Sequence, residues 1–173
     1  MQYGFYVELD RCLRCYACEV ACKNVNQIEP GPRWRRVIEV WGGEFPDVGR
    51  TFVSLSCMHC AEPACETACP TRAITKRVED GIVVVDREKC IGCHYCFFAC
   101  PFGIPQFGKD GTMQKCNFCL ERLGPKEQPA CAATCPSKAL HAGTMEELAQ
   151  LAQQKAGKKL VASTEPSMLI SGP

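Results

Sequence analysis

Sixteen cysteines occur in this 173-residue chain, and they form four groups of four. The groups are Cys12, Cys15, Cys18 and Cys22; Cys57, Cys60, Cys65 and Cys69; Cys90, Cys93, Cys96 and Cys100; and Cys116, Cys119, Cys131 and Cys135. Every group ends in the spacing C-x3-C, and no cysteine lies outside the pattern. Because four thiolates complete the ligand set of one metal centre, the sequence predicts four four-cysteine centres.

The third group has the most specific spacing. Residues 90–101 read C-x2-C-x2-C-x3-C-P, the bacterial ferredoxin run in which three cysteines hold one 4Fe-4S cluster and the fourth ligates the neighbouring cluster. Such motifs therefore work in pairs. Pro70, Pro101 and Pro136 each follow the last cysteine of a group, where a residue that cannot continue a helix turns the chain away.

Other uses of cysteine fit this pattern less well. A disulfide scaffold is typical of short secreted chains and does not need cysteines two residues apart in every motif. Structural zinc sites also use C-x2-C pairs, but they favour two separated pairs, whereas most ligands here come as three plus one. The pattern uses every cysteine, which leaves no catalytic thiol and no catalytic residue to assign. A zinc-stabilised interaction module remains the alternative from a different functional class.

Composition limits the partners and the core. The net charge is +1 and the pI is about 7.4, which gives no reason to expect a nucleic-acid partner. No apolar run reaches the length of a transmembrane helix, and the N-terminus lacks the regions of a signal peptide. The hydrophobic share of 46% includes the cysteines, so we expect a modest core whose folding depends on iron.

The hydrophobic pattern predicts an α+β chain of short helices and small antiparallel sheets, rich in loops and clusters. Strands are expected at residues 3–9, 33–41, 51–55 and 139–142, with a hairpin at 73–77 and 82–85. Short helices are expected at 17–23 and 97–99. Thr144 and Glu147 have the spacing of a capping box for a helix that ends near residue 154. Beyond residue 155 the sequence predicts an extended tail, either disordered or gripping a partner.

Charge differs between the first and third groups. Basic residues surround the first group, and this predicts a higher reduction potential there because positive charge favours the reduced cluster. An apolar shell around the third group predicts a lower potential. The basic residues are Arg11, Arg14 and Lys23, and the apolar ones are Ile91, Tyr95, Phe97 and Phe98.

Together with the four groups, residues 57–65 (CMHCAEPAC), 81–86 (GIVVVD) and 90–93 (CIGC) carry a resemblance to a known family. Over residues 2 to about 145, the chain resembles the four-cluster iron-sulfur (beta) subunit of the dimethyl sulfoxide reductase superfamily of molybdenum or tungsten enzymes. Dimethyl sulfoxide, polysulfide and thiosulfate reductases contain this type of subunit. The nitrate reductase relatives replace one cysteine of the third motif by tryptophan, but Cys93 and Cys96 are both present here. The resemblance therefore implies that all four centres are 4Fe-4S clusters.

The resemblance also implies which motifs share clusters, with two ferredoxin-like units nested one inside the other. The outer unit comprises residues 1–28 and 105–145, the inner unit 52–104, and residues 29–51 form an insertion; residues 146–173 form a C-terminal helix and tail. The implied ligand sets are Cys12, Cys15, Cys18 and Cys135 (cluster 1); Cys22, Cys116, Cys119 and Cys131 (cluster 2); Cys57, Cys60, Cys65 and Cys100 (cluster 3); and Cys69, Cys90, Cys93 and Cys96 (cluster 4).

A chain of this type is expected to relay single electrons through its four clusters as the non-catalytic subunit of an oxidoreductase complex of anaerobic respiration. Its implied partners are a large molybdopterin-containing catalytic subunit and a quinone-linked membrane anchor subunit or soluble carrier. The resemblance places it on the periplasmic side of the membrane through these partners, with the cytoplasm as the alternative. A free polyferredoxin that serves a hydrogenase or several enzymes is the other electron-transfer hypothesis.

Overall fold

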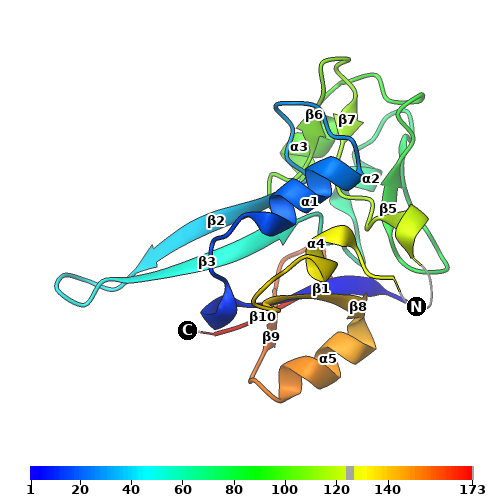
Figure 1. The fold of residues 1–173 in the computed structure, drawn as a ribbon. Helices are drawn as coiled ribbons and strands as arrows, with labels where there is room; N and C mark the ends of the chain where they lie inside the picture. Colours follow the sequence, from blue (N-terminus) through cyan, green and yellow to red (C-terminus); the bar gives the residue numbers. More distant parts are fainter. Residues whose placement is uncertain (124–126, 173) are drawn as a thin grey trace.

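The computed structural model describes residues 1–123 and 127–172, and Figure 1 shows the arrangement of its elements. The helices are α1 (Ala17–Val25), α2 (Ala64–Thr67), α3 (Tyr95–Ala99), α4 (Ala130–Ala133) and α5 (Met145–Gln153), with single 3-10 turns at Leu9–Arg11 and Leu120–Arg122. The strands are β1 (Tyr3–Glu8), β2 (Arg35–Gly42), β3 (Gly49–Ser56), β4 (Ile74–Lys76), β5 (Val83–Val85), β6 (Gln106–Phe107), β7 (Met113–Gln114), β8 (Leu140–Thr144), β9 (Lys158–Lys159) and β10 (Met168–Ser171).

A four-stranded sheet of order β8-β1-β10-β9 forms the base of the molecule. Strand β1 pairs with β8 in antiparallel and with β10 in parallel orientation. Successive side chains of a strand point to opposite faces, and β1 is buried on both. Phe5 and Val7 join the main core with several cysteines, whereas Tyr6 packs against Leu148 of α5. The sheet therefore separates α5 from the cysteine-bearing loops (Figure 1).

The C-terminal segment differs from the extended tail that the sequence predicts. Strand β10 lies beside β1, with Phe5 opposite Met168 and Glu8 opposite Ser171, and Met168 is buried in the main core. The apolar side chains of β10 explain the difference, because they complete the core on one side of β1. Strand β10 also pairs with backbone groups of β1 that would otherwise form an open sheet edge.

The predicted strands and hairpins are present, with small shifts at their ends. Strands β2 and β3 pair from Arg35 opposite Ser56 to Gly42 opposite Gly49, and this hairpin projects away from the rest of the chain (Figure 1). Its tip is exposed, and Phe45 is 93% accessible. Strands β4 and β5 form the predicted antiparallel hairpin. The short β6–β7 hairpin and the parallel β1–β10 pair were not predicted, so the sheets are not all antiparallel.

The predicted helices are also present. Helix α1 extends two residues beyond its expected end, and α3 begins two residues before its expected start. Thr144 Oγ1 accepts a hydrogen bond from the Glu147 N–H at 3.3 Å, and Glu147 Oε2 accepts one from the Thr144 N–H at 2.9 Å, which confirms the capping box. Across the part of the chain that the structure describes, no helix combines the length and the apolar character needed to cross a membrane. The small α+β character is confirmed, whereas the division into nested units stays a prediction.

Candidate metal centres

The four C-x2-C loops share one backbone feature. In each loop the residue before the second cysteine has a positive φ: 54° at Arg14, 41° at His59, 66° at Gly92 and 60° at Phe118. Non-glycine residues pay of order 1–3 kcal/mol for such a conformation, which persists where function or packing requires it. Left-handed residues let successive backbone N–H groups converge into the anion-binding concavities found at many Fe–S sites. The loops are therefore suited to hold an anionic group.

One pocket brings together three cysteines of the first group and the last cysteine of the fourth. It has about 360 Å³ of empty space, and Cys12, Cys15, Cys18 and Cys135 all line it. The Ser54 hydroxyl lies 3.4 Å from Cys18 Sγ. Of the four thiols, Cys15 is exposed to solvent and Cys18 and Cys135 are buried. This grouping is the one expected for cluster 1, and its ligation of iron stays a prediction.

A second pocket is lined by Cys69 and by Cys90, Cys93 and Cys96 of the third group. It has about 310 Å³ of empty space, and Cys93 is its exposed thiol. The Ala73 N–H donates to Cys69 Sγ at 3.2 Å. The expected members of cluster 4 therefore lie together around one pocket, with a backbone donor already directed at a sulfur.

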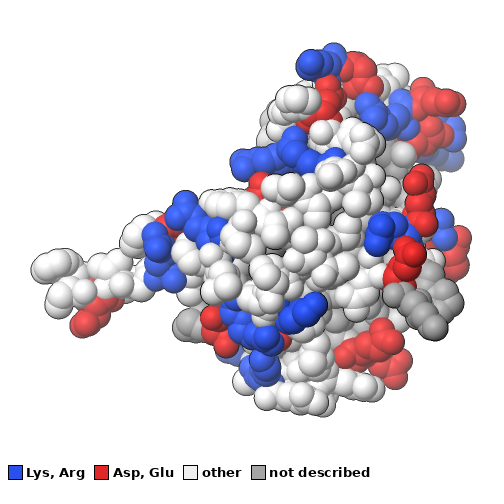
Figure 2. Space-filling model, viewed as in Figure 1, with Lys and Arg blue, Asp and Glu red and all other residues white. Residues whose placement is uncertain are grey.

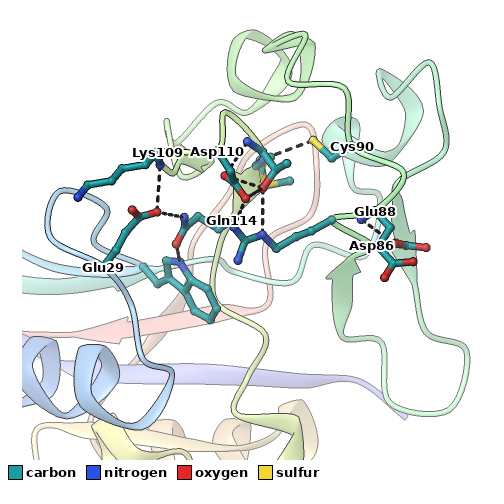
Figure 3. Close-up of polar contacts among 11 residues, drawn as sticks. Glu29, Asp86, Glu88, Cys90, Lys109, Asp110 and Gln114 are labelled. Atoms are coloured by element: carbon teal, nitrogen blue, oxygen red, sulfur yellow. Dashed lines mark hydrogen bonds and ion pairs between the residues drawn. The ribbon is translucent and has the colours of Figure 1, made fainter.

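The β6–β7 turn supplies another such donor, because the Met113 N–H lies 3.3 Å from Cys90 Sγ (Figure 3). Asp110 Oδ1 shapes the turn by accepting from the Thr112 N–H at 3.0 Å. Glu29 Oε1 accepts from the Lys109 N–H at 3.1 Å and from Gln114 Nε2 at 3.3 Å (Figure 3). The segment after α1 thus holds a loop that contacts the third cysteine group.

The expected members of cluster 2 are also neighbours in space. Asn26 Nδ2 lies 3.8 Å from both Cys22 Sγ and Cys119 Sγ. Burial raises the pKa of the Cys22 thiol above its usual range, and the nearby charges of Cys116 and Cys131 raise it further. The structure therefore places the fourth cysteine of the first motif beside three cysteines of the fourth motif.

The thiols expected to hold cluster 3 also affect one another's pKa values. Burial raises the pKa of the Cys65 thiol to about 12, and the charges of Cys57, Cys100 and Cys60 contribute. These thiols come from the second group and the last position of the third group. The division of all sixteen cysteines into four ligand sets stays a prediction.

Two of the sites are built from the same local sequence. Residues 69–74 (CPTRAI) and 135–140 (CPSKAL) follow one pattern, and Arg72 and Lys138 within them both have a φ of 53°. Burial opposes ionisation of Cys69 and Cys135, but hydrogen bonds from the following hydroxyl group and backbone N–H groups lower the pKa of both thiols. The pockets that contain Cys69 and Cys135 therefore share one local backbone conformation and one pattern of hydrogen bonds to sulfur.

Two buried donors fit a ligand that accepts hydrogen bonds. Arg35 Nε and His59 Nε2 are buried, and neither has a hydrogen-bond partner within residues 1–123 and 127–172. An unsatisfied buried donor is costly, and the sulfides and thiolates of an iron-sulfur cluster are acceptors. In the same part of the chain, no three His, Cys, Asp or Glu side chains converge closely enough to hold one metal ion. The thiol sets, their pockets and these donors fit 4Fe-4S clusters.

In the structure, the surroundings of the first and third cysteine groups differ from those that the sequence predicts. Arg11 lies 3.6 Å from Glu8, and Arg14 lies 3.0 Å from Glu39, so carboxylates offset both cations. The four apolar residues near the third group are all exposed: Phe98 is 81% accessible, and Ile91, Tyr95 and Phe97 are exposed as well. The expected apolar shell is therefore wrong for all four residues, and the order of potentials based on it stays a prediction.

Comparison with known proteins identifies the family. Residues 48–145, more than half of the chain, match the family described as the 4Fe-4S dicluster domain. The chain belongs to this family. Within the 4Fe-4S dicluster family, it is 44% identical over 158 residues to the probable anaerobic dimethyl sulfoxide reductase chain YnfG of Escherichia coli (strain K12), covering 86% of this chain and 77% of that protein.

Other relatives in the family are named as subunits of different enzymes. The chain is 41% identical over 152 residues to the thiosulfate reductase electron transfer subunit PhsB of Salmonella typhi, covering 84% of this chain and 78% of PhsB. It is 37% identical over 179 residues to the formate dehydrogenase iron-sulfur subunit of Wolinella succinogenes, covering 90% and 88% respectively. The predicted resemblance and the expected 4Fe-4S cofactors are confirmed.

The thiol pKa values make cluster assembly sensitive to pH. Burial raises the pKa of the Cys116 thiol to about 12 and that of Cys96 to about 11, so both thiols keep their protons at neutral pH. Because iron binds thiolates, assembly must release these protons, and its apparent affinity should increase as the pH rises. Anaerobic reconstitution in a pH-stat measures the release. Assembly without proton release, or with an affinity independent of pH, would contradict this expectation.

Proposed function

We propose that this chain is the electron-transfer subunit of an anaerobic oxidoreductase complex and carries four 4Fe-4S clusters. The observation that supports this most strongly is the four sets of four thiols, each within a small region of one 173-residue chain. Each cluster, when bound, takes up and releases one electron at a time. The protein positions the clusters, shields them from water and sets their potentials.

The ligand sets proposed for the four clusters are those that the ferredoxin rule and the resemblance imply. Three thiols of each motif and the last thiol of its partner motif hold one cluster, so Cys135 completes the set of Cys12, Cys15 and Cys18. The pocket that these four residues share supports the assignment. The nested outer and inner units follow from the same pairing.

Neighbouring thiols support a linear order of the sets. Charge interactions between Cys18 and Cys131 link the set expected for cluster 1 to that for cluster 2. Cys116 and Cys57 interact in the same way and link the sets for clusters 2 and 3. Cys65 packs against the small core that contains Cys96, which links the sets for clusters 3 and 4. We infer that electrons pass along this order of clusters, in either direction.

The two end sets reach the surface. Cys15 and Cys93 are the two exposed cysteines of the chain. Leu13 is exposed near the first and Phe98 near the second. On the face shown in Figure 2, basic and acidic side chains are interspersed around the rim, and the centre is mostly uncharged. We assign the two ends to two redox partners.

The proposed partners are a large molybdopterin-containing catalytic subunit and a membrane anchor subunit linked to quinone, with a soluble carrier as the alternative to the anchor. The names of the relatives support a multisubunit complex, since they include a reductase chain, an electron transfer subunit and an iron-sulfur subunit. A location on the periplasmic side of the membrane, reached through these partners, belongs to the same proposal.

Anaerobic purification of the tagged chain from its native host tests the proposal. We expect brown protein with about sixteen irons, four for each of four clusters, that bleaches with dithionite and co-purifies with a large pterin-containing chain. Colourless protein that contains zinc would instead support an interaction module. Brown protein without the pterin-containing chain would support a free polyferredoxin.

A further inference from the structure

Arg35, the first residue of β2, is a buried cation between two thiol sets. Its side chain is among the largest that are fully buried, and the residue is 2% accessible. Arg35 Nη1 donates to Ser54 Oγ at 3.0 Å, and Nη2 donates to Ser56 Oγ at 2.8 Å. The guanidinium carbon lies 4.3 Å from the centre of the Phe5 ring. Strand pairing and β1 therefore fix the position of the charge.

This guanidinium has no carboxylate partner within the described parts of the chain, residues 1–123 and 127–172. A buried charge without a counter-charge is strongly destabilising. The hydroxyls of Ser54 and Ser56 are neutral, so they satisfy N–H groups of Arg35 without offsetting its charge. Some other anion must offset this charge when the protein holds its cofactors.

The cysteines around Arg35 indicate what that anion is. Ser54 Oγ, which accepts from Arg35, also lies 3.4 Å from Cys18 Sγ. Phe5, whose ring faces the guanidinium, belongs to the same core cluster as Cys18, Cys116 and Cys131. Cys18 belongs to the set proposed for cluster 1, and Cys116 and Cys131 belong to the set for cluster 2.

We infer that Arg35 is the shared buried counter-charge of clusters 1 and 2 and raises the reduction potentials of both. The inference rests on the proposed function, because it requires clusters in these two sets. Reduction adds one negative charge to a cluster, and a fixed cation in a low-dielectric interior stabilises the reduced form more than the oxidised form. Arg35 influences the clusters through its charge and its fixed position. Its unpartnered Nε–H is available to a cluster or thiolate sulfur.

Potentiometric EPR titration of the cluster-loaded full chain tests the inference. In Arg35→Gln, we expect the one-electron reduction constants of two of the four clusters to fall about tenfold, which corresponds to about 59 mV each. Arg35→Lys should keep most of the potential because it keeps the charge. Arg50→Gln is the matched control: it removes one positive charge from the same hairpin, and Arg50 is exposed and paired with Glu39. It should leave all four potentials unchanged.

A second variant covers the case in which Arg35→Gln fails to assemble. Ser56→Asp places a carboxylate beside Arg35 Nη2 and offsets the charge while it keeps the arginine, so the same two potentials should fall. Iron content separates the outcomes. Wild-type chain without sixteen irons would refute the proposed function, whereas fully loaded Ser56→Asp and Arg35→Gln chains with unchanged potentials would overturn only the role of Arg35. If Arg35→Gln does not incorporate its clusters, Ser56→Asp decides alone. Unchanged potentials in fully loaded Ser56→Asp would then overturn the role of Arg35.

Discussion

Replacing Cys135 by alanine is expected to remove one of four intact 4Fe-4S centres, and the affected centre is the one whose other ligands are Cys12, Cys15 and Cys18. Cys135 is buried in the pocket with these three thiols, and alanine offers no ligand in its place. The centre should be lost or converted to a three-iron form, and electron transfer along the chain of clusters should be interrupted. Spin quantitation of the reduced protein by EPR, combined with iron analysis, measures the number of intact centres.

Ser137→Ala is the matched control for this substitution. The Ser137 hydroxyl lies 3.7 Å from Cys135 Sγ, so the variant removes a neighbour of the thiol but leaves all sixteen cysteines in place. It should retain four centres, with a change in potential confined to one of them. Four intact centres in Cys135→Ala itself would show that Cys135 is not a ligand.

Removal of the iron is expected to abolish cooperative folding. Cys18, Cys57, Cys116, Cys131 and Cys135 are members of the main core, and Cys96 belongs to the second core around β4 and β5. Without clusters, the loops that carry these residues lose their cross-links, and metal-dependent small domains commonly unfold under such conditions. Treatment with an oxidant and a chelator should therefore remove the cooperative urea transition seen by circular dichroism.

The structure also predicts where residual order should remain. Tyr6, Leu148, Ala152 and Leu169 form a separate cluster between α5 and the sheet, and no cysteine belongs to it. In hydrogen exchange, peptides from residues 12–22 and 57–100 should lose protection first, while those from β1 and α5 should keep more of it. A chain without iron that keeps its full protection pattern would contradict the dependence of the fold on its clusters.

Local signals in the sequence were sufficient to predict most elements of the fold. The capping box at Thr144 and Glu147 fixed the start of α5, a run of aromatic and aliphatic residues marked β1, and the turn at residues 79–81 marked the β4–β5 hairpin. The sequence does not predict β10. This strand follows a polar stretch, and no turn signal links it to β1, its parallel partner. Its pairing depends on the open edge of β1, which is a tertiary property.

The candidate ligands could be predicted because thiolate spacing is a local property, and their division into four sets stays a prediction. Arg35 could not be identified in this way. It stands in a sequence with Arg33 and Arg36 nearby, and only the strand pairing turns Arg35 inward, towards Ser54 and Ser56. Arg36 instead donates to the Gly103 carbonyl at 3.0 Å. The charge around the first cysteine group could not be predicted for the same reason. The ion pairs of Arg11 with Glu8 and of Arg14 with Glu39 depend on the fold.

The nested sharing of ligands between distant motifs is the central claim, and counting intact centres in two double variants tests it most directly. Cys12→Ala/Cys135→Ala removes two ligands of one proposed centre, so three intact 4Fe-4S centres should remain, as in each single variant. Cys116→Ala/Cys135→Ala affects two proposed centres, although both residues belong to the same motif, so two should remain. Two intact centres in the first double variant and three in the second would show that each motif binds its own cluster, and would contradict the account.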